Sequence, residues 1–333
     1  MPTSSSPRIG ANVAIVGGAG FIGSHFTDHL LGRSTTARLT IYDNFSSGRA
    51  WHHEHHLDDE RFAVVRGEVA DLDALTGALE GHHTVIHLAS NPDIAKAMTD
   101  PTVDFVEGTA LTNNVAEASR RAGVGLVLYA SGSGVYGDLG DVPATEDHSP
   151  MEPVSTYGAS KLAGETLLCS YAHMFGGRAR AFRFANVVGP RQTHGVGFDF
   201  VRRLRAEPEH LTVLGDGSQS KSYVHVDDVV NAVLFAAERS PDVPFAAYNV
   251  GTEDHITVRE IAALAIEVVG LDPAEVTVTY GTEDRGWKGD VPIVRISTER
   301  IRALGWTCAR TTREALRASL VSMVADDEAG RLT

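Results

Sequence analysis

A tyrosine and a lysine four residues apart, Tyr157 and Lys161, are the residues of this chain best suited to proton transfer. If a helix begins near Thr156, both side chains leave the same face one turn apart, so the phenol and the ammonium point the same way. A free tyrosine has a pKa of about 10 and is a poor base at neutral pH. A neighbouring positive charge stabilises the phenolate, so the pair predicts an acid–base centre.

The same spacing is common on ordinary surface helices, and the glycines near the start of the chain decide between the two interpretations. Gly17, Gly20 and Gly23 follow an apolar run, Val13–Val16, and open a helical pattern. Glycines there permit a tight turn, backbone contact with a pyrophosphate, and close packing of helix on strand. Asp43 lies 20 residues beyond Gly23, at the spacing of the acid that holds an adenosine ribose. We therefore predict a bound dinucleotide.

Alternating elements position these residues. The apolar runs expected as strands are 13–16, 39–42, 62–65, 84–88, 125–130 and 180–184, and the amphipathic stretches between them include 72–79, 112–122 and 156–175. This alternation predicts an α/β fold with a Rossmann-type doubly wound parallel sheet.

After about residue 186 the chain breaks into loops rich in Gly and Pro. Short helices are expected at 198–205, 226–239 and 257–269, with short strands at 212–214 and 277–280. We predict a dinucleotide-binding domain at 9–185, to which parts of 220–255 return, and a smaller C-terminal substrate-binding lobe at 186–325.

Composition excludes several classes of protein. A formal net charge of −14 argues against nucleic acid and anionic membranes as partners. No apolar run is long enough to cross a bilayer, and the start of the chain lacks a secretory signal. Two cysteines make no disulfide framework, so a cytoplasmic location is expected.

Further motifs complete a family pattern. They are Asp43–Gly48, His87–Ala89, Val135–Gly137, Arg183–Asn186, Gly189–Arg191, Gly215–Gly217, Tyr223–Asp228 and Arg285–Trp287. With the glycines and the Tyr–Lys pair, they resemble the extended short-chain dehydrogenases/reductases of the nucleotide-sugar epimerase and dehydratase branch, most of all UDP-hexose 4-epimerases. The resemblance spans about residues 11–320. It implies NAD as cofactor, a UDP-sugar as substrate, and a homodimer formed through helices at 112–122 and 156–175.

The resemblance also implies the cofactor contacts. Those residues are Gly17, Gly20, Phe21, Ile22 and Gly23 at the pyrophosphate; Asp43, Asn44, Phe45, Ser47 and Gly48 at the ribose; Glu68 and Val69 at the adenine; and Leu88, Ala89, Ser90, Phe184, Tyr157 and Lys161 on the nicotinamide side. The Asp43 carboxylate repels a 2′-phosphate, so NAD is expected rather than NADP.

The hydroxyl that usually completes the catalytic set is where this chain departs from the family. The family carries Ser or Thr three residues before its Val-Tyr-Gly motif, and that position is Gly132 here, flanked by Ser131 and Ser133. Either Ser133 reaches the sugar, or a backbone group and water replace the hydroxyl. We favour Ser133 as the third catalytic residue.

The neighbouring position indicates the reaction. Similar dehydratases place an Asp-Glu pair just before Val-Tyr-Gly, and UDP-glucuronate decarboxylases keep a Glu there, whereas this chain has Ser133 and Gly134. Without that acid, oxidation and re-reduction at C4 predict epimerisation. The alternatives are a nucleotide-sugar 4,6-dehydratase, a UDP-glucuronate decarboxylase, or a non-catalytic NAD-sensing regulator, for which Gly132 is the sole support.

Substrate contacts are implied mainly in the second half. They are Ser131, Gly132, Ser133, Tyr157, Asn186, Arg191, Val196, Leu211, Val213, Lys221 and Arg285. Lys221 stands where the family usually has Arg, which keeps the charge but loses bidentate geometry. Whether C6 of the sugar is a hydroxymethyl group or a carboxylate stays open.

A run of histidines invites a metal interpretation. His52 and His56 are four residues apart within Trp51–His56, a spacing at which two imidazoles can share an ion. A solvated polar helix is the commoner explanation for such a run, and we predict no metal site.

Overall fold

A seven-stranded, wholly parallel sheet forms the centre of the protein. The computed structural model describes residues 9–331. The strands are β1 (Asn12–Val16), β2 (Arg38–Asp43), β3 (Phe62–Arg66), β4 (Thr84–His87), β5 (Leu126–Gly132), β6 (Arg178–Phe184) and β11 (Phe245–Val250), in the order β11-β6-β5-β4-β1-β2-β3. All seven strands run in the same direction, but the order in which successive strands are added reverses between β1 and β4. Ligands of such sheets bind outside the carboxyl ends of the strands at that point. The predicted Rossmann-type fold is confirmed.

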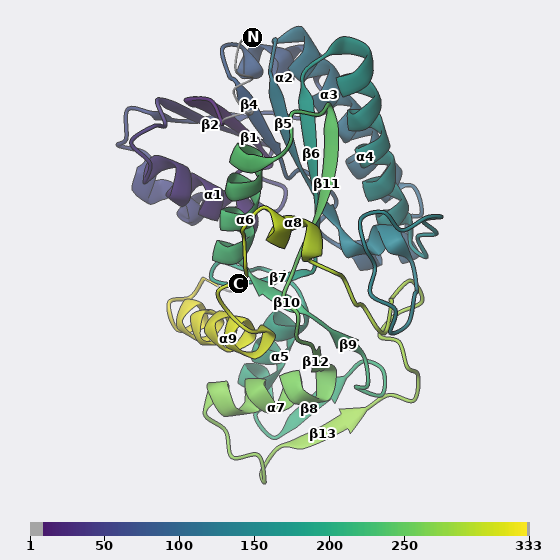
Figure 1. Cartoon of the computed structure of the whole chain (residues 1–333). Coiled ribbons are helices and arrows are strands. Elements are labelled where there is room, and N and C mark those ends of the chain that lie inside the picture. Colours follow the sequence, from purple (N-terminus) through teal and green to yellow (C-terminus); the bar gives the residue numbers. More distant parts are fainter. Residues whose placement is uncertain (1–8, 332–333) are drawn as a thin grey trace.

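Two helical layers cover the sheet (Figure 1). One consists of α2 (Leu72–Leu79), α3 (Leu111–Arg121) and α4 (Thr156–Phe175), and the other of α1 (Phe21–Leu31) and α6 (Val226–Arg239). Alternate strand residues face opposite layers: Ile15 packs with the α1 and α6 side, and Val16 with the α2–α4 side. The sheet is therefore buried on both faces, which is why its strands read as apolar runs.

Short helices connect the main elements. They are η1 (Ala50–His52), η2 (Glu54–His56), η3 (Ile94–Met98), the π-helical η4 (Phe105–Ala110) that leads into α3, and η5 (Ser133–Tyr136) directly after β5.

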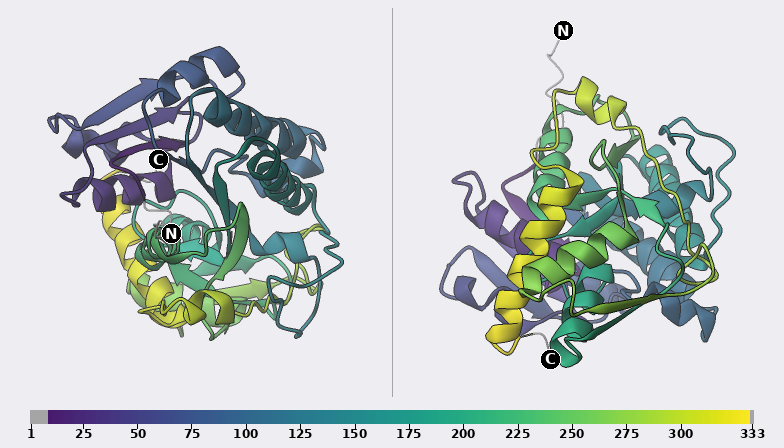
Figure 2. Two further views of the ribbon diagram at one scale, coloured as in Figure 1. Left: turned by 45° about the horizontal axis from the view of Figure 1, so that its top comes forward. Right: turned by 90° about the horizontal axis from the view of Figure 1, so that it is seen from below.

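A second core lies beyond the carboxyl ends of the sheet strands. It is built from α5 (Val196–Ala206), α7 (Val258–Val269) and α9 (Thr312–Glu328), which pack on one another (Figure 2). The remaining elements are the parallel pairs β7 (Asn186–Val188) with β10 (Tyr223–His225) and β8 (His210–Val213) with β13 (Thr277–Tyr280), the antiparallel pair β9 (Ser220–Lys221) with β12 (Ile256–Thr257), and α8 (Glu299–Ala303). Because β7 follows β6 after one residue, this second core stands over the ligand edge of the sheet.

The chain crosses between the two cores more than once. After β7–β10 it returns through α6, which packs on α1, and through β11, which pairs with β6. The division at 185/186 stays a prediction. Within residues 9–331, no helix combines the length and the apolar character needed to span a bilayer.

Candidate active site

The turn between β1 and α1 leaves room for a ligand at one of its three motif glycines. Gly17 has a φ of +82°, and a Cβ there would lie 2.5 Å from the Ala89 nitrogen. A Cβ on Gly23 would lie 2.6 Å from the Gly18 oxygen, whereas one on Gly20 would meet nothing nearer than 3.6 Å. Among residues 9–331, no side-chain hydrogen bond caps the start of α1. The turn thus presents unpaired amides and an open backbone, which fits a phosphate.

Asp43 ties the predicted ribose loop to the glycine turn. Its Oδ2 accepts a hydrogen bond from the Ala19 amide at 2.8 Å, and its Oδ1 accepts one from the Phe45 amide at 2.7 Å. Each carboxylate oxygen keeps a second lone pair for a ribose hydroxyl. Beside it, Asn44 Nδ2 donates to Glu68 Oε2 at 3.0 Å, so the residues predicted at ribose and adenine lie in contact.

The loop after β4 closes the other side of this edge. The amides of Leu88 and Ala89 both donate to the Val16 carbonyl, at 2.8 and 3.0 Å. The Ser90 hydroxyl is buried and has no partner within the described residues, which is the condition of a group reserved for a ligand. Gly20, Asp43 and Ser90 together fit a dinucleotide.

The Tyr157–Lys161 pair lies on the first turns of α4. The Ser155 side chain caps this helix by accepting from the Gly158 amide at 3.1 Å. Lys161 is 4% exposed, and its Nζ donates to the Ala130 carbonyl at 2.9 Å. The same Nζ lies 5.4 Å from the centre of the Tyr157 ring. Phenol and ammonium therefore face the end of β5, as an acid–base centre requires.

Burial sets the charge state of this pair in the protein alone. It raises the pKa of Tyr157 to about 12, and the negative charge of Asp104 adds to the rise. It lowers the pKa of Lys161 from 10.5 to about 8, although Asp104 opposes that change. The sequence predicted a more acidic phenol, but burial outweighs the ammonium here. A cationic nicotinamide ring is the further charge that the phenolate needs.

Three small residues at the end of β5 and the start of η5 differ in their surroundings. Ser131 Oγ donates to Glu165 Oε1 at 2.5 Å, inside the protein. Gly132 is extended, with φ −153° and ψ 162°, and a Cβ there would meet nothing nearer than the Phe184 oxygen at 4.0 Å. Ser133 begins η5 and is partly exposed. Of the two serines, Ser133 is the one whose hydroxyl is not already held by the core.

The predicted substrate cations already have anionic partners. Lys221 Nζ donates to Asp290 Oδ1 at 2.5 Å. Arg285 donates to Asp138 Oδ2 at 2.9 Å and to the Asp290 carbonyl at 3.2 Å. A diphosphate arriving at either side chain therefore exchanges with a carboxylate or adds to it.

The other predicted substrate residues lie at the entry to the second core. Asn186 Nδ2 donates to the Ser222 carbonyl at 3.4 Å, and Val196 opens α5. The side chains of Leu211 and Val213 are fully buried in the second core. If Leu211 and Val213 contact a ligand, they therefore do so through their backbone atoms and not through their side chains.

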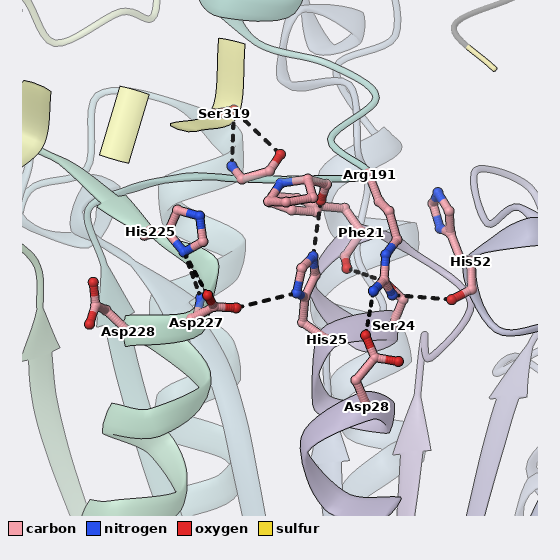
Figure 3. A network of polar contacts seen from close by, with 12 residues as sticks. Phe21, Ser24, His25, Asp28, His52, Arg191, His225, Asp227, Asp228 and Ser319 are labelled. Carbon is pink, nitrogen blue, oxygen red and sulfur yellow. Dashed lines mark hydrogen bonds and ion pairs between the residues drawn. The ribbon is translucent and has the colours of Figure 1, made fainter. Parts of the chain in front are cut away.

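Arg191 reaches the dinucleotide-binding side of the protein (Figure 3). It pairs with Asp28 of α1, and its other nitrogen donates to the His52 carbonyl at 3.1 Å. The adjoining Pro190 carbonyl lies 3.0 Å from His25 Nε2, also on α1. Arg191 thus fastens the loop after β7 to the helix that follows the glycine turn.

The histidine run is not the solvated helix that the sequence suggested. His52 and His53 are buried, and His52 Nδ1 lies 2.9 Å from the Ala19 carbonyl. Burial lowers the pKa of His52 to about 4, so its ring is neutral near pH 7. The run forms two short helices, η1 and η2, and His52 joins the first of them to the glycine turn.

Asp28 gathers the other two histidines. Its Oδ1 lies 3.1 Å from His55 Nε2 and 2.7 Å from His56 Nε2, and these three side chains alone among the described residues have the spacing of a metal site. The Arg191 guanidinium occupies the remaining carboxylate oxygen. A divalent ion there would meet fixed positive charge, which disfavours its binding.

We therefore expect EDTA, and a His55→Gln/His56→Gln double variant, to leave turnover within about twofold of the untreated parent, because surface pairs of this kind contribute little. Product formation by chromatography after dialysis is the measurement. Activity that disappears with EDTA and returns with zinc would contradict the prediction that the protein has no metal site.

Sequence reasoning missed two carboxylates near the Tyr157–Lys161 pair. Asp104, buried beside η4, accepts from Asn91 Nδ2 at 2.9 Å and from Thr156 Oγ1 at 2.6 Å. Glu165 lies one helical turn beyond Lys161 and pairs with Arg183. Neither belongs to a recognisable motif, and only the fold brings their partners together.

The fold and the site are those of a dinucleotide-dependent enzyme in which a tyrosine and a lysine lie together at the carboxyl end of a central strand. A model of the NAD dependent epimerase/dehydratase family matches residues 13–251. The chain is 35% identical over 263 residues to the UDP-glucose 4-epimerase of Mycolicibacterium smegmatis, covering 77% of this chain and 82% of that one. It is 31% identical over 328 residues to UDP-glucuronic acid decarboxylase 2 of Arabidopsis thaliana, covering 96% and 68%.

A solved structure of a UDP-galactose 4-epimerase superposes with a TM-score of 0.83 at 36% identity, covering 95% of this chain and 99% of that one. The protein therefore belongs to the NAD dependent epimerase/dehydratase family, and its cofactor is NAD. The predicted family and cofactor are confirmed.

Proposed function

We propose that the protein catalyses NAD-dependent C4 epimerisation of a UDP-sugar, interconverting UDP-glucose with UDP-galactose or UDP-glucuronate with UDP-galacturonate through a transient 4-keto sugar. The observation that carries this proposal is the catalytic turn itself. The turn after β5 has Gly134 where dehydratases and decarboxylases carry an acid, and α4 places Tyr157 and Lys161 next to that turn. The similarity to UDP-sugar epimerases supports the choice of substrate.

The chain's own groups supply the proton chemistry. When bound, NAD would supply the redox chemistry: NAD+ would accept a hydride from C4 of the sugar, and the NADH so formed would return a hydride to C4. Tyr157 takes the proton of the C4 hydroxyl during the oxidation and returns it during the reduction, while the Lys161 ammonium lowers the free energy of the phenolate. Ser133 donates a hydrogen bond to the same sugar oxygen. A 4-keto sugar that turns over in the pocket before reduction gives the C4 epimer.

Recognition of the nucleotide is assigned to the second core. Lys221, Arg285 and Asn186 are proposed at the diphosphate and sugar, and β8 and α5 at the uridine. Arg191 keeps its proposed place near the sugar, although in the protein alone it pairs with Asp28.

Decarboxylation of UDP-glucuronate is the second candidate, because the chain also resembles a decarboxylase over nearly its full length. A Cβ on Gly134 would lie 3.6 Å from Gly158 Cα, an ordinary contact. The fold therefore leaves space for an acid that the sequence omits, which favours epimerisation. The retained Tyr157–Lys161 pair disfavours a non-catalytic regulator.

The test is incubation of the purified protein with UDP-glucose, UDP-glucuronate and their C4 epimers, without added NAD. Interconversion with all carbons and oxygens retained is the expected result for one of the two pairs, and that pair identifies the C6 group. Loss of water or carbon dioxide would replace the proposal with a dehydratase or a decarboxylase. Absence of any product would favour a regulator.

The catalytic hydroxyl has its own test. Ser133→Ala is expected to lower kcat by about tenfold, the scale of one lost hydrogen bond to a reacting group. Adding Gly132→Ser to that variant should recover most of the loss, because the backbone at 132 is extended and its Cβ direction is open. Steady-state kcat of both variants is the measurement. An unaffected Ser133→Ala would leave the role to a backbone group and water.

A homodimer remains a proposal. Among the exposed apolar side chains are Phe105 and Val106 of η4 and Met174 and Phe175 at the end of α4. Met174 and Phe175 lie in the predicted pairing helix 156–175, and η4 directly precedes α3, which covers most of the other predicted helix, 112–122.

A further inference from the structure

A buried ion pair to which the proposed reaction gives no role lies behind the catalytic turn. Glu165 of α4 and Arg183 of β6 are each 4% exposed, and Arg183 Nη2 lies 2.7 Å from Glu165 Oε2. Arg183 Nε donates to Glu165 Oε1 at 3.0 Å, so the contact is two-pronged. Desolvation of two charges often cancels their attraction. Stability alone is thus a weak explanation for the pair, and its other contacts are informative.

The pair holds both ends of the segment that presents Ser133. Ser131, two residues before Ser133, donates to Glu165 Oε1 at 2.5 Å. Tyr136, three residues after Ser133, accepts at its hydroxyl from Arg183 Nη1 at 2.9 Å. One ion pair therefore forms hydrogen bonds to residues on both sides of Ser133.

The same pair is part of the helix that carries the base. Tyr157, Lys161 and Glu165 follow one another at four-residue intervals and line one face of α4. Lys161 Nζ donates to the Ala130 carbonyl at 2.9 Å, and Glu165 accepts from the next residue, Ser131. Two consecutive residues of β5 are thus bonded to two consecutive turns of α4, which fixes the register between strand and helix.

The hydrogen-bond network of this ion pair continues beyond Tyr136. The Tyr136 hydroxyl donates to Asn249 Oδ1 at 2.7 Å, and Asn249 Nδ2 donates to the Ala144 carbonyl at 2.9 Å. The Asn249 amide donates to Glu146 Oε1 at 2.7 Å. A buried network in which the members are satisfied in this way rigidifies a single arrangement.

We propose that Glu165 and Arg183 are positioning residues that set the placement of the Ser133 turn relative to Tyr157, so that both hydroxyls address one sugar oxygen. This inference rests on the proposed function. The pair touches neither sugar nor nucleotide, and acts through Ser131 and Tyr136 on one side and through α4 on the other.

Two variants test it. Glu165→Gln keeps the shape of the side chain but removes its charge. Tyr136→Phe removes the hydrogen bond between Arg183 and the Tyr136 hydroxyl and leaves the ion pair in place. Both are expected to lower kcat by about 10- to 100-fold, the cost of displacing reacting groups by a fraction of an ångström to an ångström, with KM for the UDP-sugar and the content of bound NAD unchanged. Hydrogen exchange of a peptide spanning 131–137 should accelerate in both.

Arg180→Met is the matched control. Arg180 is fully buried on the same strand, but it donates to the carbonyls of Ala179 and Pro241, both at 2.8 Å, and not to the catalytic turn. It should lower the melting temperature while kcat of the folded protein and exchange of 131–137 stay at parental values.

Parental kcat in Glu165→Gln and Tyr136→Phe, with only a lower melting temperature, would overturn the positioning role. A raised KM with unchanged kcat would overturn it too, because it would indicate substrate binding. These failures differ from failure of the proposed function, which shows in the parent as a dehydrated or decarboxylated product. In that case, kcat for the formation of that product is compared among the same variants, and this comparison still tests the positioning role. A parent without any product would overturn both.

Discussion

Tyr157→Phe is expected to lower kcat for UDP-sugar epimerisation by about 10³-fold, within the range for loss of a positioned acid–base group. The phenol oxygen is the group that we propose takes and returns the C4 proton. The phenyl ring keeps the contact with the Lys161 ammonium, which lies 5.4 Å from the ring centre, so the fold and the bound NAD should be retained. Steady-state kcat and the NAD released on denaturation are the two measurements.

Tyr129→Phe provides the comparison for this variant. Its ring centre lies 5.3 Å from the same ammonium, but it is buried in β5 beneath the site. Turnover should stay near the parental value. If Tyr157→Phe converted sugars as fast as Tyr129→Phe, the acid–base assignment would be wrong.

Lys161→Met is expected to lower kcat by about 100-fold and yet to leave the nucleotide-free protein at least as stable as the parent at pH 7. The kcat falls because the phenolate loses its one nearby ammonium. The stability holds because burial lowers the Lys161 pKa from 10.5 to about 8, and each pKa unit corresponds to about 1.4 kcal/mol. The buried ammonium thus costs about 3 kcal/mol of folding free energy below pH 8, a figure in which the opposing charge of Asp104 is already included.

The pH dependence gives this prediction its sign. Between pH 8 and 10.5 the unfolded lysine still holds a proton that the folded lysine has lost, so the parent gains stability as pH rises. The advantage of Lys161→Met should therefore be largest below pH 8 and vanish near pH 10.5. Urea unfolding of both proteins at pH 7, 9 and 10 measures it. A parent that is more stable than the variant at pH 7 and loses that lead with rising pH would show that the ammonium is stabilised by its surroundings.

Much of the fold was accessible from the sequence because local pattern and burial agree. The helices α2, α4 and α6 begin and end at the predicted residues. The π-helical η4 was missed, because a change in hydrogen-bond register leaves no mark on the hydrophobic pattern. The pairing of β11 with β6 was also inaccessible, since no local signal in Phe245–Val250 names its neighbour.

The site was predictable where it depends on motifs and unpredictable where it depends on long-range pairing. The glycine turn and the position of Tyr157 and Lys161 on one helix face follow from spacing alone. The contact of Arg191 with Asp28 joins residues 163 positions apart. The sequence gives no sign that Glu165 pairs with Arg183, because only the fold brings the two side chains together. The pKa of Tyr157 depends on burial and on Asp104, which sequence spacing does not contain.

The late return of β11 to the sheet bears on how the chain is made. On the ribosome, β6 is the outermost strand until the chain has grown past Val250, and its outer row of N–H and C=O groups then has no partner. Such an open edge is a template for association with other chains. While the segment between Phe184 and Phe245 is being translated, the nascent sheet therefore has an open edge at β6 that the finished protein covers with β11.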